Sequence, residues 1–312
     1  MKHIITLIAI LFGFQSLYSQ CACCAGASIA SSNGDNSNAA VTLDKGKWML
    51  ETYGDYRIFE EGAHHDNQAN EESGVEETPL KNLSIGVFGL RYGLAKRISL
   101  SVAVPYVFVG TDEGSANGLG DLVALSTFKL YSKNNFNLGL TAGVELPVGE
   151  RKNSTFDETT VVVGSGSYDP MAGLTIAKGW NKLSLKGNLL GKYTTNGFED
   201  ANYGSLVVQQ INAGYQLRGI NSLCTSDSLK TNRGFSWNVF GGYYGEWLGQ
   251  IEEDGEKDPN TGYYLGFASL GTSIGYAGWN IPITFLLPAI QELNGEQNKT
   301  RYRARVGLTK VF

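Results

Sequence analysis

Apolar and polar residues alternate with a period of two in twelve separate segments of this chain. In the segment 97–109, for example, every second residue from Ile98 to Phe108 is aliphatic or aromatic, whereas Ser99 and Ser101 lie on the other face. Such a strand has one apolar face and one wet face, and most of the segments are long enough to cross a membrane at a tilt. The segments are 47–58, 82–92, 97–109, 120–131, 136–148, 170–178, 183–194, 204–218, 235–247, 263–276, 279–287 and 301–312. The apolar faces must therefore meet either a second sheet or lipid.

The connections between the segments distinguish these two possibilities, because short and long connections alternate. The short ones are 93–96, 132–135, 179–182 and 277–278, and the long ones are 59–81, 110–119, 149–169, 195–203, 248–262 and 288–300. The connection 219–234 breaks this rule, and it carries Cys224. Outer-membrane barrels have short periplasmic turns and long outer loops. We therefore predict an all-β fold, a transmembrane antiparallel β-barrel of about twelve strands, preceded by a short unstructured segment.

The composition agrees with a barrel. The chain has 40 Gly among 312 residues, and only 18% of its residues are charged, which argues against a disordered chain. Beyond residue 20 no apolar run approaches the roughly 18 residues of a transmembrane helix. The net charge of −5 gives no indication of a nucleic-acid partner.

The first twenty residues have the organisation of a secretory signal peptide. Lys2 and His3 precede an apolar core from Ile4 to Phe14, and a polar stretch ends near Gln20. We predict a cleaved signal at 1–20, a Cys-containing flexible segment or plug at 21–45, and an outer-membrane barrel at 46–312. The outer-membrane lipid would then be a partner of the folded chain.

Three cysteines, Cys21, Cys23 and Cys24, lie together after the predicted cleavage site, and Cys224 lies far along the chain. In an oxidising compartment a disulfide or an unpaired thiol is the simpler interpretation. The alternatives are a thiolate site for Cu or Zn and acylation of Cys21. A second candidate metal site is His64-His65 in the first long connection. No other cofactor is indicated.

The last segment ends on the aromatic Phe312, with Arg303 and Arg305 on its wet face. An amphipathic terminal strand that ends in this way resembles the signal read by the barrel-assembly machinery. Aromatic residues also gather near segment ends, as expected for the two membrane interfaces. They are Trp48, Tyr92, Tyr106, Phe108, Tyr193, Tyr215, Trp247, Trp279 and Phe312.

Charged residues on the wet faces are candidates for the lining of a barrel interior. They are Glu51, Asp55, Arg57, Arg91, Asp121, Lys129, Glu145, Lys186, Lys192, Glu246, Arg303 and Arg305. We expect Arg91 and Asp121 to join an internal ion network, and Gly93 to permit a tight turn. Signatures of nucleotide-binding, metalloprotease and serine-hydrolase enzymes are absent from the sequence, so we predict a non-enzymatic protein.

Five short motifs resemble, in order and spacing, those of a bacterial outer-membrane family. They are Leu90-Arg91-Tyr92-Gly93-Leu94, Val104-Pro105-Tyr106, Gly118-Leu119-Gly120-Asp121, Leu146-Pro147-Val148-Gly149 and Gly164-Ser165-Gly166-Ser167. The family is the β-barrel "transporter" family labelled meta-pathway of phenol degradation, and the N-terminal cysteines resemble a Cys-rich variant of it. The resemblance covers roughly residues 80–312.

The resemblance implies a porin-like barrel that passes a small, often aromatic or apolar, organic molecule by passive transport. One alternative is a metal-linked transporter that uses the N-terminal cysteines, with Cu or Zn as the solute. The other is a structural or adhesive barrel that transports nothing.

Overall fold

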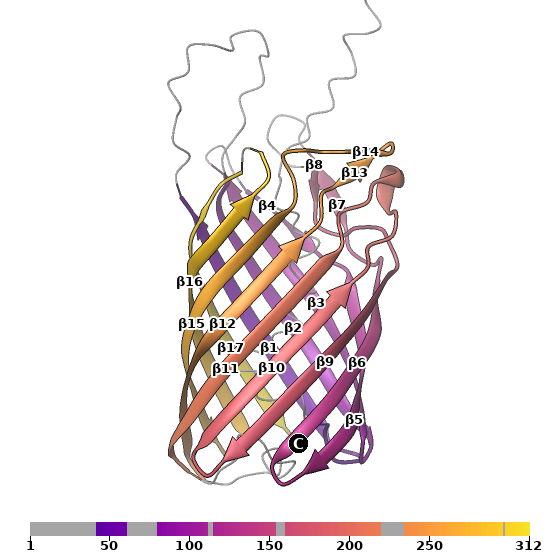
Figure 1. Ribbon diagram of the computed structural model, residues 1–312. Coiled ribbons are helices and arrows are strands. Elements are labelled where there is room, and N and C mark those ends of the chain that lie inside the picture. The colour runs from indigo at the N-terminus through magenta and orange to yellow at the C-terminus, as the bar shows by residue number, and fades with distance from the viewer. Residues whose placement is uncertain (1–41, 61–79, 112–114, 154–159, 220–233, 296) are drawn as a thin grey trace, which may run out of the picture.

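The computed structural model describes residues 42–60, 80–111, 115–153, 160–219, 234–295 and 297–312. Twelve long antiparallel strands form a closed, tilted barrel (Figure 1). They are β1 Trp48–Phe59, β2 Leu80–Ala95, β3 Ile98–Thr111, β5 Leu122–Lys133, β6 Phe136–Leu146, β9 Asp169–Trp180, β10 Leu183–Lys192, β11 Leu206–Arg218, β12 Ser236–Leu248, β15 Tyr263–Tyr276, β16 Trp279–Leu293 and β17 Thr300–Val311. Each pairs with its neighbour in the sequence, and β1 also pairs with β17, which closes the barrel. The predicted fold and all twelve strands are confirmed.

The two ends of the barrel differ. One end, the turn end, carries tight connections such as Asn134-Asn135 and Ala277-Gly278, in which both residues have positive φ. These conformations belong to the hairpin turns whose twist matches that of the flanking strands. The C-terminus also lies at this end (Figure 1). The strand ends joined by the long connections β1–β2, β6–β9, β10–β11, β12–β15 and β16–β17 lie at the other end, the loop end, whereas β11 ends and β12 begins at the turn end.

The loop end holds short elements that the sequence pattern did not predict. They are β4 Ser115–Leu119, which pairs with β3, the hairpin of β7 Arg151–Asn153 with β8 Thr160–Val162, the hairpin of β13 Glu252–Glu253 with β14 Glu256–Lys257, and the 3-10 turn η1 Phe198–Asp200. Elements of two to five residues contain too few positions for a period to be recognised. Strand β16 is also longer than predicted and continues past Pro288 to Leu293.

Large apolar side chains cover the outside of the barrel, as the alternation predicts. Leu270, Phe88 and Ile211 are more than half exposed, although they lie in the middle of their strands. At the turn end the rings of Trp48 and Tyr92 contact each other on the outer face, with centroids 4.4 Å apart. Within the described residues, no helix is long and apolar enough to cross a membrane.

The first described residues lie against the inner wall at the turn end. Leu43 is buried with Met49 and Val311, and its backbone N–H donates a hydrogen bond to Ser99 Oγ at 2.8 Å. This approach explains Gly93, because a Cβ there would lie 2.0 Å from the Asp44 carbonyl oxygen. The prediction that Gly93 permits a turn was wrong: it lies within β2, and its missing side chain makes room for the N-terminal segment.

Candidate functional site

The interior of the barrel is divided into two chemically different halves. The loop-end half contains two clusters of apolar side chains and, among them, the two charged networks described below. The first cluster contains Met171, Leu190, Leu206, Val208, Leu248, Leu265 and Phe267, and the second contains Phe59, Leu83, Ile85, Val87, Val107, Val109 and Val163. The turn-end half is lined by buried amides and hydroxyls, including Ser99, Asn137, Gln216, Asn238, Ser273 and Thr309. The apolar clusters and both charged networks therefore lie toward the loop end, whereas amides and hydroxyls line the turn end.

One charged network joins the neighbouring strands β1 and β17 to β12, which β16 and β15 separate from β17 in the sheet. Arg303 Nε donates to both oxygens of Asp55 at 2.7 Å, and Arg305 Nε donates to Asp55 as well. Glu246 accepts hydrogen bonds from Arg303 at 3.1 Å and from Arg57 at 3.4 Å. All five side chains are buried, so this arrangement keeps opposite charges in contact within a low-dielectric interior.

Two tyrosines complete this network, and neither was identified from the sequence. Tyr244 and Tyr263 donate their hydroxyls to Glu246 at 2.8 and 2.7 Å. The guanidinium of Arg305 also lies over the ring of Tyr244, 4.3 Å from its centroid. Tyr244 lies two positions before Glu246 on β12, so both side chains point into the barrel. This alternation was the one feature of the sequence that could have identified Tyr244.

A second charged network lies across the barrel, on β6, β9 and β10. Lys192 Nζ lies 2.8 Å from Glu145 Oε1 and 3.4 Å from Asp169 Oδ2, and all three side chains are buried. The strand order places these strands opposite β17. The two networks differ in composition: the first contains three arginines and two carboxylates, and this one contains one lysine and two carboxylates.

The remaining candidate lumen residues lie apart from these networks. Arg91 pairs with Glu51, with a nitrogen–oxygen distance of 3.2 Å. Lys186 is buried beside Asn212 and Asn238 at a small internal cavity. Lys129 is half-buried.

The Asp121 carboxylate binds the connection between β6 and β9 and does not join a charged network. Its Oδ1 accepts a hydrogen bond from the Gly149 amide at 2.8 Å, and its Oδ2 accepts from the amide and the hydroxyl of Ser165. The backbones of Gly149 and Gly164 touch, and a Cβ on either would lie 2.6 Å from the other. The expectation that Asp121 joins Arg91 in an ion network was wrong. Three of the five motifs instead meet at this carboxylate, which we call the Asp121 clasp.

The clasp has consequences for the interior. It fixes the connection between β6 and β9, so that Val163 is buried in the second apolar cluster. Phe198 from the next connection covers Gly166, and its N–H donates to the Ser165 carbonyl at 3.1 Å. Two long connections therefore fold together over this side of the loop end.

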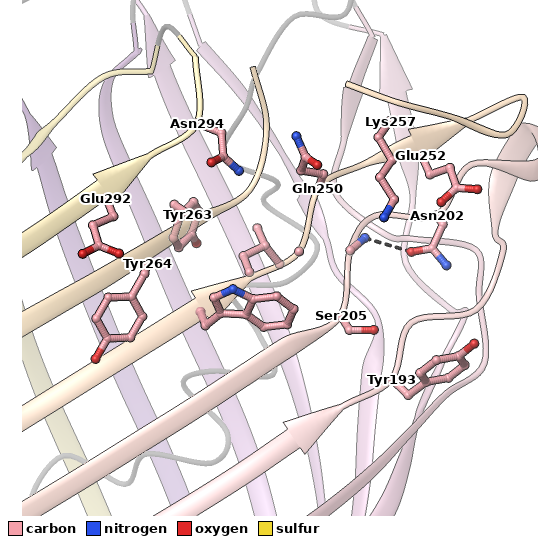
Figure 2. Close-up of a pocket in the computed structure, with 14 residues that line it drawn as sticks. Tyr193, Asn202, Ser205, Gln250, Glu252, Lys257, Tyr263, Tyr264, Glu292 and Asn294 are labelled. Atoms are coloured by element: carbon pink, nitrogen blue, oxygen red, sulfur yellow. Dashed lines mark hydrogen bonds between the residues drawn. The ribbon is translucent and has the colours of Figure 1, made fainter. Parts of the chain in front are cut away.

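A groove of about 560 Å³ lies at the loop-end rim (Figure 2). Its walls come from the ends of β12, β15 and β16, from the β13–β14 hairpin and from residues 193–205. Aromatic and polar side chains line it, and Tyr264 and Glu292 lie on the opposite side from Tyr193 and Glu252 (Figure 2). Of the residues that line it, the sequence analysis named Tyr193 and Trp247, as aromatic residues expected at a membrane interface, and it named none as a binding residue.

The candidate metal ligands Cys21, Cys23, Cys24, Cys224, His64 and His65 lie outside the described residues. Among the residues that are described, no group of three or more His, Cys, Asp and Glu side chains is placed to hold a metal. A Cu or Zn site therefore stays a prediction.

Comparison with known proteins extends the fold assignment. The COG4313 outer membrane channel from Pseudomonas putida F1 matches with a TM-score of 0.64 and 16% identity, covering 88% of this chain and 98% of that chain. The NanC porin (TM-score 0.43, 10% identity, 84% and 98% coverage) and the CymD monoaromatic hydrocarbon channel (TM-score 0.42, 10% identity, 91% and 94% coverage) are too distant to support a conclusion. No family model and no curated protein matches. The first likeness shows a shared barrel fold.

Proposed function

We propose that this chain is an outer-membrane channel through which a small aromatic or apolar organic molecule passes passively. The observation that carries the proposal is the two clusters of apolar side chains inside the loop-end half, which include Val107, Leu265 and Phe267 and lie beside mutually paired charges. Water-filled porins have polar interiors. Apolar side chains form no hydrogen bonds with water. When an apolar solute contacts them, apolar surface on both is removed from water, and this stabilises the bound solute.

The charges inside the barrel are compatible with such a solute. Asp55 and Glu246 contact arginines, and Lys192 contacts two carboxylates. Because these opposite charges contact one another, the electric field inside the barrel is weaker than isolated charges would produce. An uncharged molecule therefore meets a smaller electrostatic barrier. The proposed pore lining comprises both charged networks together with the Glu51–Arg91 pair.

Export and assembly form part of the proposal. The signal at 1–20 would be cleaved, and Phe312 would be read by the barrel-assembly machinery before insertion into the outer-membrane lipid. Phe312 extends the final strand: its N–H donates to the Trp48 carbonyl at 2.9 Å, and its side chain is exposed. The burial of Leu43 in the turn-end mouth supports a plug role for residues 21–45.

The test is entry of an apolar probe into cells whose lipopolysaccharide leaflet excludes it, such as 1-N-phenylnaphthylamine. Cells that carry the protein should take up this dye faster than cells that do not. Val107→Asn places an amide in the second apolar cluster, at a cost of about 1–2 kcal/mol for a bound apolar solute, and should slow dye entry about fivefold or more. Ser101→Asn, on the same strand nearer the turn end, is the matched control.

Both variants must fold, which their heat-dependent migration on gels reports. Equal dye entry with and without a correctly folded barrel would refute the channel. Equal entry through the wild type and Val107→Asn would refute the apolar route.

A further inference from the structure

We propose that the groove at the loop-end rim binds a neutral saccharide. The register aligns Trp247, Tyr264 and Glu292 side by side on three neighbouring strands. Tyr193 and the hairpin residues Glu252 and Lys257 face them across the groove (Figure 2). Its volume of about 560 Å³ falls within the usual range for small-molecule sites.

The aromatic side chains offer stacking surfaces. Trp247 is 45% exposed and Tyr193 is 67% exposed, so both rings form part of the outer surface at the loop-end rim and border the groove. A sugar ring has an apolar C–H face that packs on such a ring, while its hydroxyls remain free to hydrogen-bond at the edges.

One aromatic ring is fixed in advance. The Tyr264 hydroxyl accepts a hydrogen bond from Gln209 Nε2 at 2.8 Å and is also hydrogen-bonded to the Tyr243 hydroxyl. Tyr243 reaches it across Gly266, where a Cβ would lie 2.4 Å from the Tyr243 hydroxyl. A ring held in this way loses little conformational freedom when a ligand binds.

Polar groups suited to hydroxyl ligands surround the rings. The carboxylates of Glu252 and Glu292 line the groove together with these rings. Carboxylates accept hydrogen bonds from hydroxyls, and the side-chain amides of Gln250 and Asn294 can both donate and accept. Convergent acceptors beside exposed rings match the two kinds of surface on a sugar.

The charges exclude other ligand classes. Two carboxylates and one lysine repel phosphates and acidic sugars. A hydrocarbon would desolvate the carboxylates without replacing their hydrogen bonds. A neutral polyhydroxylated ligand satisfies both the rings and the carboxylates, and it can come from a free saccharide or from a glycan carried by a membrane lipid.

The experiment is calorimetric titration of the full mature barrel in an amine-oxide detergent, which carries no sugar. The free probes are cellotriose and maltotriose, and the lipid-borne probe is digalactosyl diacylglycerol in phosphatidylcholine vesicles that contain the barrel. We expect saturable binding that weakens about tenfold or more, a loss of roughly 1.4 kcal/mol, in Trp247→Ala and in Glu292→Ala. Trp180→Ala, which removes an exposed tryptophan at the turn end, should leave binding unchanged.

Each result has a defined meaning. Binding of a free trisaccharide that depends on Trp247 supports the proposal and assigns a soluble source. Trp247-dependent binding of the glycolipid alone supports it and assigns a membrane source. If no probe saturates, or if folded Trp247→Ala binds as well as the wild type, the proposal is overturned.

Discussion

Removing the Glu246 carboxylate should destabilise the barrel strongly. Glu246 is 2% exposed and accepts hydrogen bonds from two arginines and two tyrosines. Glu246→Leu leaves Arg57 without this carboxylate and Arg303 with Asp55 as its remaining anion in the network. Losing one member of a buried ion network costs about 3–5 kcal/mol, and each stranded hydroxyl adds roughly 1 kcal/mol.

The free energy of unfolding can be measured by urea titration of the barrel in phosphocholine vesicles, with folding followed on gels. Glu253→Leu, at an exposed hairpin position, is the control and should stay within about 0.5 kcal/mol of the wild type. The double variant Glu246→Leu/Arg57→Leu should recover part of the loss, because it removes the Arg57 guanidinium together with the carboxylate that it contacts. A loss below about 1 kcal/mol in Glu246→Leu would refute the reasoning, since it would mean that water solvates these arginines.

Four further changes test other parts of the structure. Asp121→Ala removes the carboxylate that holds the β6–β9 connection, and trypsin should cut after Arg151 about tenfold faster, as mass spectrometry of the fragments can show. Gly164→Val pushes a side chain into neighbouring backbone and should give the same cleavage, whereas unchanged cleavage would mean that the clasp does not order this connection. Lys192→Met removes the cation between two buried carboxylates and should lower the unfolding free energy by about 3 kcal/mol in urea. Leu43→Asp should release the N-terminal segment, and protease digestion should then shorten the chain at its N-terminal end without unfolding the barrel.

The strands and their facing could be predicted because alternation is a local property. Each strand shows its own two faces, whatever it pairs with. The rule was incomplete in β3, where apolar residues occupy both parities from Val104 to Val109. Val107 and Val109 face inward there, and the apolar clusters of the loop-end interior were therefore missed.

The contacts of the candidate site could not be predicted in the same way. Parity alone indicated that Arg57 and Glu246 face inward, but their contact spans 189 positions and depends on the register of every strand between them. Asp121 was misassigned for a related reason. Its partners are backbone amides of a long connection, and connections have no period from which their path can be read.

The first charged network can form only when the barrel closes, because it includes residues of the first and the last strand. Strands β1 and β17 meet through residues 248 and 250 positions apart, Asp55 with Arg303 and Arg305. Contacts of such high sequence separation carry a large loop-closure entropy and form late. Until β17 arrives, Asp55 lacks both of these arginines. The ion pairs between β1 and β17 therefore form only when β17 has been added. A barrel truncated before Arg303 would lack these ion pairs between its last and first strands.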